Sequence, residues 1–170
     1  MSIEDELRRL ALEREAAFES ALDELDLDPP DLLLRRMRAY LAEQVDHGCI
    51  KHSAEKSVQL KPPTDGIEEL ECHAIQFASG SRLDFNIRMK NQQTGWRMTE
   101  FEFNLRLPPA RKLSMVRVHL NVQRTRDALV VPRCHLHMGG GKRAHVPFPI
   151  MSPRLTLQLV CDVMEPDVGL

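Results

Sequence analysis

The chain has 170 residues, and its 23 basic and 25 acidic side chains give a formal net charge of −2. A length of this order predicts one domain with an ordinary hydrophobic core. The near-neutral charge argues against strong non-specific binding to nucleic acid or to an anionic membrane, and it leaves room only for a local basic patch.

Cysteine usage and the first residues predict a cellular compartment. The four cysteines form no C-x-x-C pair, which excludes a zinc ribbon and a thioredoxin motif. Charges occur throughout residues 1–26, unlike in a signal peptide, and no uncharged apolar run approaches the roughly 18 residues of a membrane helix. We therefore expect a cytoplasmic protein with reduced thiols and no membrane partner.

Two helices are predicted in a helical arm over residues 1–50. The first, over 2–26, has a thin apolar stripe that consists of Ile3, Leu7, Leu10, Ala17, Ala21 and Leu25. The second, over 30–47, follows two prolines and ends at Gly48, and the two helices are expected to form a hairpin. The thin stripe either packs lightly on its own domain or pairs with a partner helix, which includes that of a second copy.

Beyond residue 56 the apolar period changes to two, which predicts β-strands. The predicted strands cover 69–77, 83–89, 96–107, 113–123 and 128–138. A shift of the apolar phase predicts one bulge between Ala74 and Ile75 and another near Thr99. Short turns between consecutive strands favour an antiparallel meander over parallel βαβ units.

A short C-terminal helix completes the predicted fold. It begins at Pro153 and ends near Met164, with Leu155, Leu159 and Val163 spaced for burial. The predicted class is α+β, with an N-terminal helical hairpin, a five-stranded antiparallel meander and a short C-terminal helix. We expect the sheet and this helix, residues 56–170, to form one globular unit with the arm, and one sheet face to be wet.

The most unusual segment runs from Arg133 to His145 and contains three histidines. Because side chains alternate along a strand, Arg133, His135 and His137 are expected to share one face. The preceding strand places Arg117 and His119 opposite its own apolar set. If the two strands form a hairpin, all five side chains lie on one surface. Glu100 and Glu102 are expected to border that surface.

Other features of this segment carry further predictions. Cys134 falls on the apolar face, which is typical of a small buried thiol. The run Gly139-Gly140-Gly141-Lys142 is no phosphate-binding P-loop, since Arg143 stands where that motif needs a hydroxyl residue. We expect a turn that returns His145 towards the other histidines and offers Lys142 to a phosphate.

Three interpretations of the histidine-bearing surface stay open. In a metal-free ribonuclease, His135 and His137 would be general acid and base, and substrate phosphate would contact Arg117, His119, Arg133 and Lys142. In a metal site, His135 and His137 would bind one divalent ion, with His145 or His119 as third ligand. In the third interpretation the surface is only a polar solvent face.

Residues 113–165 resemble the toxin components of TumE-like toxin–antitoxin pairs. The shared features are a strand containing Val118-His119-Leu120, a strand that ends in histidines, His145 before the step Phe148-Pro149, and a short helix. The resemblance implies that the histidine-rich segment, with His135, His137 and His145, is the catalytic part and acts on nucleic acid. Here a glycine triplet interrupts the family's denser histidine run, and residues 1–50 have no counterpart.

The leading prediction is a toxin-like or defence-associated ribonuclease with RNA as substrate. It would work without a cofactor or with one divalent metal, and a cognate antitoxin would be its protein partner. One alternative is a non-catalytic interaction module that docks a partner through the N-terminal helices. The other is a metal-dependent hydrolase that uses His135, His137 and His145.

Overall fold

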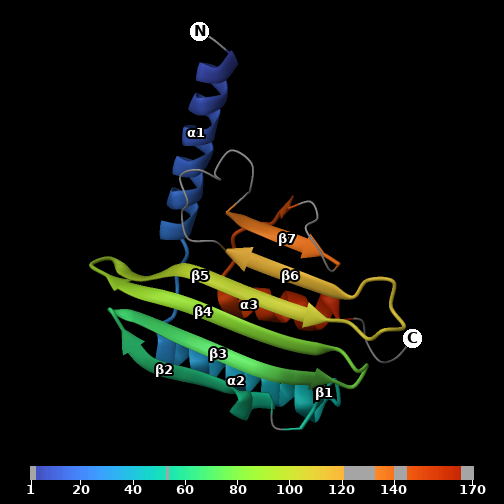
Figure 1. Ribbon diagram of the computed structural model, residues 1–170. Helices are drawn as coiled ribbons and strands as arrows, with labels where there is room; N and C mark the ends of the chain where they lie inside the picture. The colour runs from blue at the N-terminus through green and yellow to red at the C-terminus, as the bar shows by residue number, and fades with distance from the viewer. Residues whose placement is uncertain (1–2, 53, 121–132, 140–144, 166–170) are drawn as a thin grey trace.

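The computed structural model describes residues 3–52, 54–120, 133–139 and 145–165, and its elements form one sheet with two of the described helices on one face (Figure 1). The helices are α1 (Ile3–Asp23), α2 (Pro30–Asp46) and α3 (Pro153–Leu159). A 3-10 turn, Ala54–Ser57, follows α2, and a π-helical turn, Val160–Met164, continues α3.

Within the described residues, eight strands form a single antiparallel sheet. They are β1 (Ile50–Lys51), β2 (Val58–Thr64), β3 (Ile67–Phe77), β4 (Arg82–Gln92), β5 (Gly95–Arg106), β6 (Met115–Leu120), β7 (Cys134–Met138) and β8 (Val146–Pro147). Their order is β1-β3-β4-β5-β6-β7-β8, and β2 lies beside β3. The predicted α+β class is confirmed, with a helical pair first, the antiparallel sheet next and a short helix last.

The predicted number of five strands is wrong, because β1, β2 and β8 were missed. The sequence of β2 contains Pro62 and Pro63, which have no backbone N–H to donate to a neighbouring strand. Because of these prolines the segment did not look like a strand. It is tolerated because β2 pairs only with β3. The strands β1 and β8 have two residues each, too few for any apolar alternation to show. The predicted turn at 124–127 and the start of the predicted strand over 128–138 lie outside the described residues.

Both predicted bulges are present. In β3 the pairing with β4 shifts between Cys72 and Ile75, and Ala74 has a φ of 65°. The carboxylate of Asp84 accepts a hydrogen bond of 2.8 Å from the Ala74 backbone N–H, which holds this left-handed residue in place. In β5 the pairing shifts where Met98 and Glu100 oppose neighbouring residues of β4, so that Thr99 is the extra residue.

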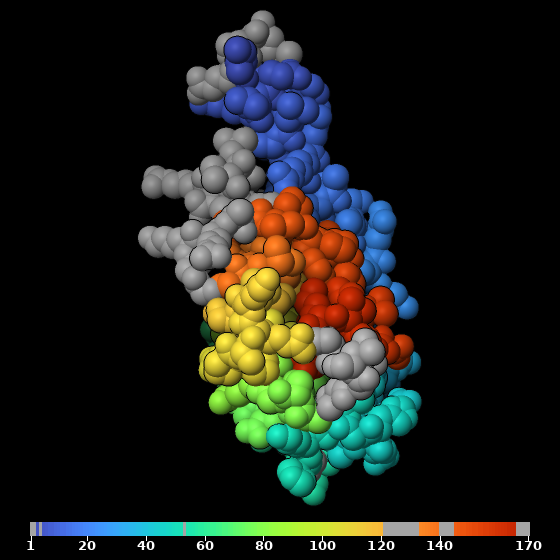
Figure 2. Space-filling model, turned by 90° about the vertical axis from the view of Figure 1, so that its right-hand side faces the viewer, coloured from blue at the N-terminus to red at the C-terminus, as the bar shows by residue number. Residues whose placement is uncertain are grey.

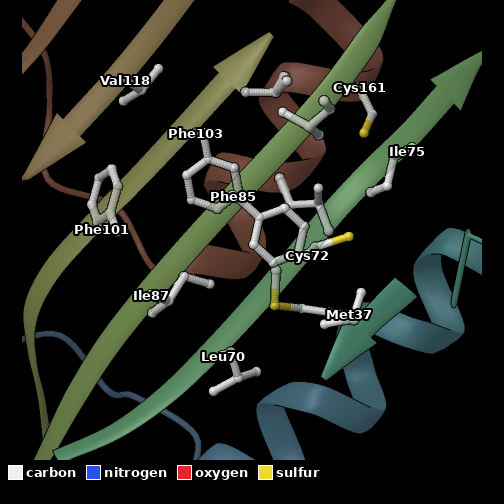
Figure 3. Packing of buried hydrophobic residues seen from close by; sticks show 14 of the residues in the cluster. Met37, Leu70, Cys72, Ile75, Phe85, Ile87, Phe101, Phe103, Val118 and Cys161 are labelled. Carbon is white, nitrogen blue, oxygen red and sulfur yellow. The ribbon is translucent and has the colours of Figure 1, made fainter. Parts of the chain in front are cut away.

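The core lies between the sheet and the helices α2 and α3 (Figure 3). From β4, Leu83, Phe85, Ile87 and Met89 are buried, as the period of two predicts. The rings of Phe85 and Phe103 stack with centroids 5.1 Å apart. Met37 of α2 is fully buried against this layer. The second predicted helix is therefore part of the core, and the opposite sheet face carries the polar side chains of each strand.

Helix α1 lies apart from α2 and extends past the β7 side of the sheet (Figures 1 and 2). Its C-terminal half is anchored to the sheet by ion pairs. Arg97 of β5 binds Glu19 and also Asp23, the latter at 2.8 Å. Its N-terminal half exposes apolar side chains, with 82% of Ile3 and 54% of Leu7 accessible. The N-terminal half of the predicted apolar stripe therefore faces solvent.

The C-terminal helix has the predicted extent but buries a different face. Leu155 and Val163 are 52% and 68% exposed, whereas Leu157 and Val160 are buried. The sequence offers two apolar stripes with helical spacing, and periodicity alone cannot tell which one is buried. The helix also ends in a π-helical turn, which changes the spacing of side chains in its last turn. The prediction therefore selected the wrong stripe.

Candidate metal centre

Strands β6 and β7 bring three histidines onto one face of the sheet. In their antiparallel pairing, His119 is opposite His135, and Arg117 is opposite His137. Val118 and Leu120 of β6 are buried in the core, so the intervening His119 points to the other face. The β alternation that the sequence predicts therefore gathers His119, His135 and His137 on a single patch.

The patch contains a fourth imidazole, because His145 returns to it just before β8. Its ring centroid lies 4.6 Å from that of His135 and 4.3 Å from that of His137. The rings of His135 and His137 are 4.7 Å apart, and the ring of His119 stacks on His135 at 5.3 Å. We call these four residues, His119, His135, His137 and His145, the histidine cluster.

Three of the four imidazoles present nitrogen atoms to a common point. One ring nitrogen each from His119, His135 and His137 lies within 4.8 Å of the other two. The Nε2 atoms of His135 and His137 are 3.0 Å apart. Ligands at the usual zinc–nitrogen distance in a tetrahedron have nitrogen atoms about 3.3 Å apart, so small side-chain rotations suffice to place an ion among them.

Burial favours the neutral form of two of these imidazoles, His119 and His137, because it lowers their pKa. His135 is only 1% exposed, although its sheet face was expected to be wet. Burial lowers the pKa of His119 to about 4, and the nearby Arg117 and two other histidines add to this against the opposing charge of Glu102. The pKa of His137 is lowered too, by burial first and then by His135 and His145. Neutral imidazole is the form that binds a metal.

His119 has an unmet hydrogen-bonding atom. Its Nε2 is buried and has no hydrogen-bond partner among the described residues. A buried nitrogen without a partner costs about 1–3 kcal/mol, and such atoms in native proteins call for an explanation. A bound ion at the common point of the cluster would satisfy it.

A polar network on β5 borders the cluster. Asn104 and Glu102 lie opposite Arg117 and His119 in the β5–β6 pairing. The side-chain oxygen of Asn104 accepts a hydrogen bond from Arg117 Nε, and its amide donates to Glu102 at 2.5 Å. Arg117 Nε also lies 3.5 Å from the Glu102 carboxylate. Glu102 was expected at this border. Asn104 was missed, although the alternation that faces it to this side was evident in the sequence.

Arg133 is held by side chains of helix α1. It precedes β7 and its guanidinium binds two carboxylates of α1, Glu15 at 2.9 Å and Glu19. It also lies over the ring of Phe18, 4.7 Å from the ring centre. Arg133 therefore anchors α1 to the sheet, and the phosphate contact expected of it stays a prediction. Lys142, the other expected phosphate ligand on this side, lies outside the described residues.

The cysteines supply no further ligand to this site. Cys134 is buried on the core face, away from the histidines that flank it in sequence, as predicted. Burial raises its pKa to about 12, so its thiol stays protonated.

The comparisons with known proteins add no relative. No protein-family model, no curated protein and no solved structure matches the chain significantly. The resemblance to TumE-like toxins therefore stays a prediction. Among the described residues, no helix has the length and apolar character that crossing a bilayer requires.

Proposed function

We propose that the protein is a metal-dependent hydrolase whose histidine cluster binds one divalent transition-metal ion. The observation that carries this proposal is the convergence of ring nitrogens from His119, His135 and His137 within 4.8 Å. Three imidazole ligands suit zinc best among common ions, because hard cations such as magnesium prefer oxygen ligands.

The number of ligands favours catalysis over a structural role. Catalytic zinc sites keep three protein ligands and leave a fourth position for water, whereas structural sites are closed by four. Binding to the ion lowers the pKa of such a water to about 7, which makes hydroxide available at neutral pH. The exposed His145, beside His135 and His137, is placed either to accept a proton from that water or to act as a fourth ligand.

Two observations favour this chemistry over metal-free acid–base catalysis. General acid–base work needs one imidazole to be protonated, and burial disfavours this for His119 and His137. The metal-free mechanism also relied on two arginines for phosphate, and Arg133 is bound to α1 instead. Metal binding needs neither a charged imidazole nor Arg133.

Metal analysis of the purified protein tests the proposal. Protein stripped with a chelator and then dialysed against zinc should retain one ion per chain. Cobalt in place of zinc should give the visible absorption bands of a four-coordinate site. His135→Ala and His137→Ala should each abolish retention. His73→Ala is the matched control, because this β3 imidazole has 72% of its side chain exposed. Retention well below one ion per chain would overturn the proposal.

A metal-free ribonuclease remains the second candidate, on one observation. At 3.0 Å, His135 Nε2 and His137 Nε2 are within hydrogen-bond distance, so that the pair could share one proton. RNA cleavage that survives saturating EDTA and is lost in the double variant His135→Ala, His137→Ala would favour this candidate. A toxin of this kind would also slow growth on induced expression, and the same double variant should relieve the effect.

A further inference from the structure

The ligands of the proposed metal centre leave its charge uncompensated. Imidazoles are neutral ligands, so an ion held by His119, His135 and His137 would keep two positive charges. The carboxylate of Glu102, which acts on His119 and His137, already faces the guanidinium of Arg117 at 3.5 Å. Among the described residues, the centre is therefore suited to an anionic substrate, whose charge would stabilise the bound ion.

Arg117 is the residue best placed to hold such a substrate. It lies directly opposite His137 on the same sheet face, one strand away from it. Its Nε edge is fixed by Asn104 and Glu102, which orients the planar guanidinium. In the described part of the chain, its Nη2 contacts only the sulfur of Met115 at 3.9 Å, and no oxygen accepts from either Nη atom.

Two other arginines of this sheet face, Arg82 and Arg88, are engaged differently. Arg82 binds Asp84 through Nε and Nη2, and Arg88 spans the carboxylates of Glu69 and Glu100. Their terminal nitrogens are used in ion pairs, whereas Arg117 is held by its inner edge and has 36% of its side chain exposed. Two parallel N–H donors next to a metal ion match two oxygens of a tetrahedral phosphoryl group.

We infer that the site hydrolyses a phosphate ester, with Arg117 holding the phosphoryl oxygens beside the metal ion. This inference rests on the proposed metal centre. In the reaction, the oxygen of the metal-bound water forms a bond to phosphorus and the P–O bond to the leaving alcohol breaks. One water proton passes to the leaving alkoxide, through His145 where that residue acts as proton carrier, and the other stays on the new phosphate. The products are one alcohol and one phosphate, with no oxidant or reductant involved.

The test uses full-length protein loaded with zinc, bis(p-nitrophenyl) phosphate as substrate and inorganic phosphate as competing ligand. The wild type should hydrolyse the diester and be inhibited by phosphate. Arg117→Gln should retain one zinc per chain and weaken phosphate inhibition by about tenfold or more, since charge-assisted hydrogen bonds of this kind typically contribute that much. Arg88→Gln removes one charge from the same face and should leave the inhibition constant unchanged.

The outcomes separate this inference from the function on which it rests. Zinc retention with hydrolysis of p-nitrophenyl acetate, but no diester hydrolysis and no phosphate binding, would overturn the phosphate ester alone. Absence of zinc retention would overturn both. Arg117→Lys is a second variant in case Arg117→Gln does not fold. It keeps the positive charge but lacks the two parallel N–H donors of the guanidinium. If its inhibition constant equals that of the wild type, the guanidinium does not hold the phosphate and the inference fails.

Discussion

His135 and His137 occupy alternate positions of one strand and direct their Nε2 atoms at each other across 3.0 Å. Residues two apart on a strand share a face but are about 7 Å apart along it, so both side chains must lean together to reach this separation. Two imidazoles gain little from such an approach beyond one hydrogen bond. An ion between them, with His119 as third ligand, would give the arrangement a larger driving force, as we propose.

Zinc should stabilise the folded protein. A ligand that binds only the folded state at a hundred times its Kd adds about 2.7 kcal/mol to the free energy of unfolding. For a chain of this length that corresponds to a rise of about 5–10 °C in Tm, measured by thermal denaturation with zinc and with EDTA. His137→Ala should melt at one temperature in both buffers, and His73→Ala should shift as the wild type does. A Tm indifferent to zinc in the wild type contradicts the prediction.

His145→Ala should distinguish a ligand from a proton acceptor. His145 is outside the set of ring nitrogens that converge within 4.8 Å, so we expect zinc affinity to fall less than tenfold. Hydrolysis should fall by about 10²–10⁴-fold, the usual contribution of a positioned acid or base.

His119→Ala is the comparison for this experiment. Loss of a residue that hydrogen-bonds a metal ligand already costs about 10–100-fold in metal affinity, and loss of a ligand itself should cost more. Zinc affinities from competition with a chromophoric chelator give both values. Equal losses in the two variants would make His145 a fourth ligand and the centre a closed one.

The metal-free protein should lose stability as the pH falls from neutral. The unfolded chain takes up a proton on His119 near its ordinary pKa of about 6.5, whereas the folded chain does so only near the lowered pKa of about 4. Between these values the unfolded state binds more protons, so the free energy of unfolding falls with the pH and levels off below about 4. His137 acts in the same direction, since its pKa is lowered too.

Urea titrations in EDTA from pH 7.5 to 4 measure this effect. His119→Gln cannot take up the proton and should flatten the dependence, while His73→Gln should leave it as in the wild type. A slope unchanged by His119→Gln would show that another group controls it.

β alternation in the sequence was enough to predict which sheet face carries the histidines, but it could not predict their burial. A period of two places His119, His135 and His137 on one face as soon as the two strands are paired, and the pairing follows from their adjacency in the chain. Burial of His135 could not be predicted in this way, because alternation names a face and says nothing of what covers it.

Long-range partners account for what the sequence did not reveal. Arg133 stands in the same alternation as His135, yet two carboxylates of α1 more than a hundred residues earlier hold it. An ion pair across such a separation leaves no periodic trace. The short strands β1 and β8 escaped for a related reason, since two residues paired to a distant neighbour carry no local pattern.

Substitutions in the two helices of the N-terminal arm should have different effects on the free energy of unfolding. Met37 of α2 is fully buried in the core, so Met37→Ala should lower the free energy of unfolding by about 2–5 kcal/mol. Leu12 of α1 is 72% exposed, and Leu12→Ala should change it by no more than about 0.5 kcal/mol. If Met37→Ala proves too unstable to purify, Met37→Leu provides a milder change of below about 1.5 kcal/mol. Urea denaturation of each variant gives these values, and comparable losses at both positions would mean that α1 packs in the folded protein as firmly as α2 does.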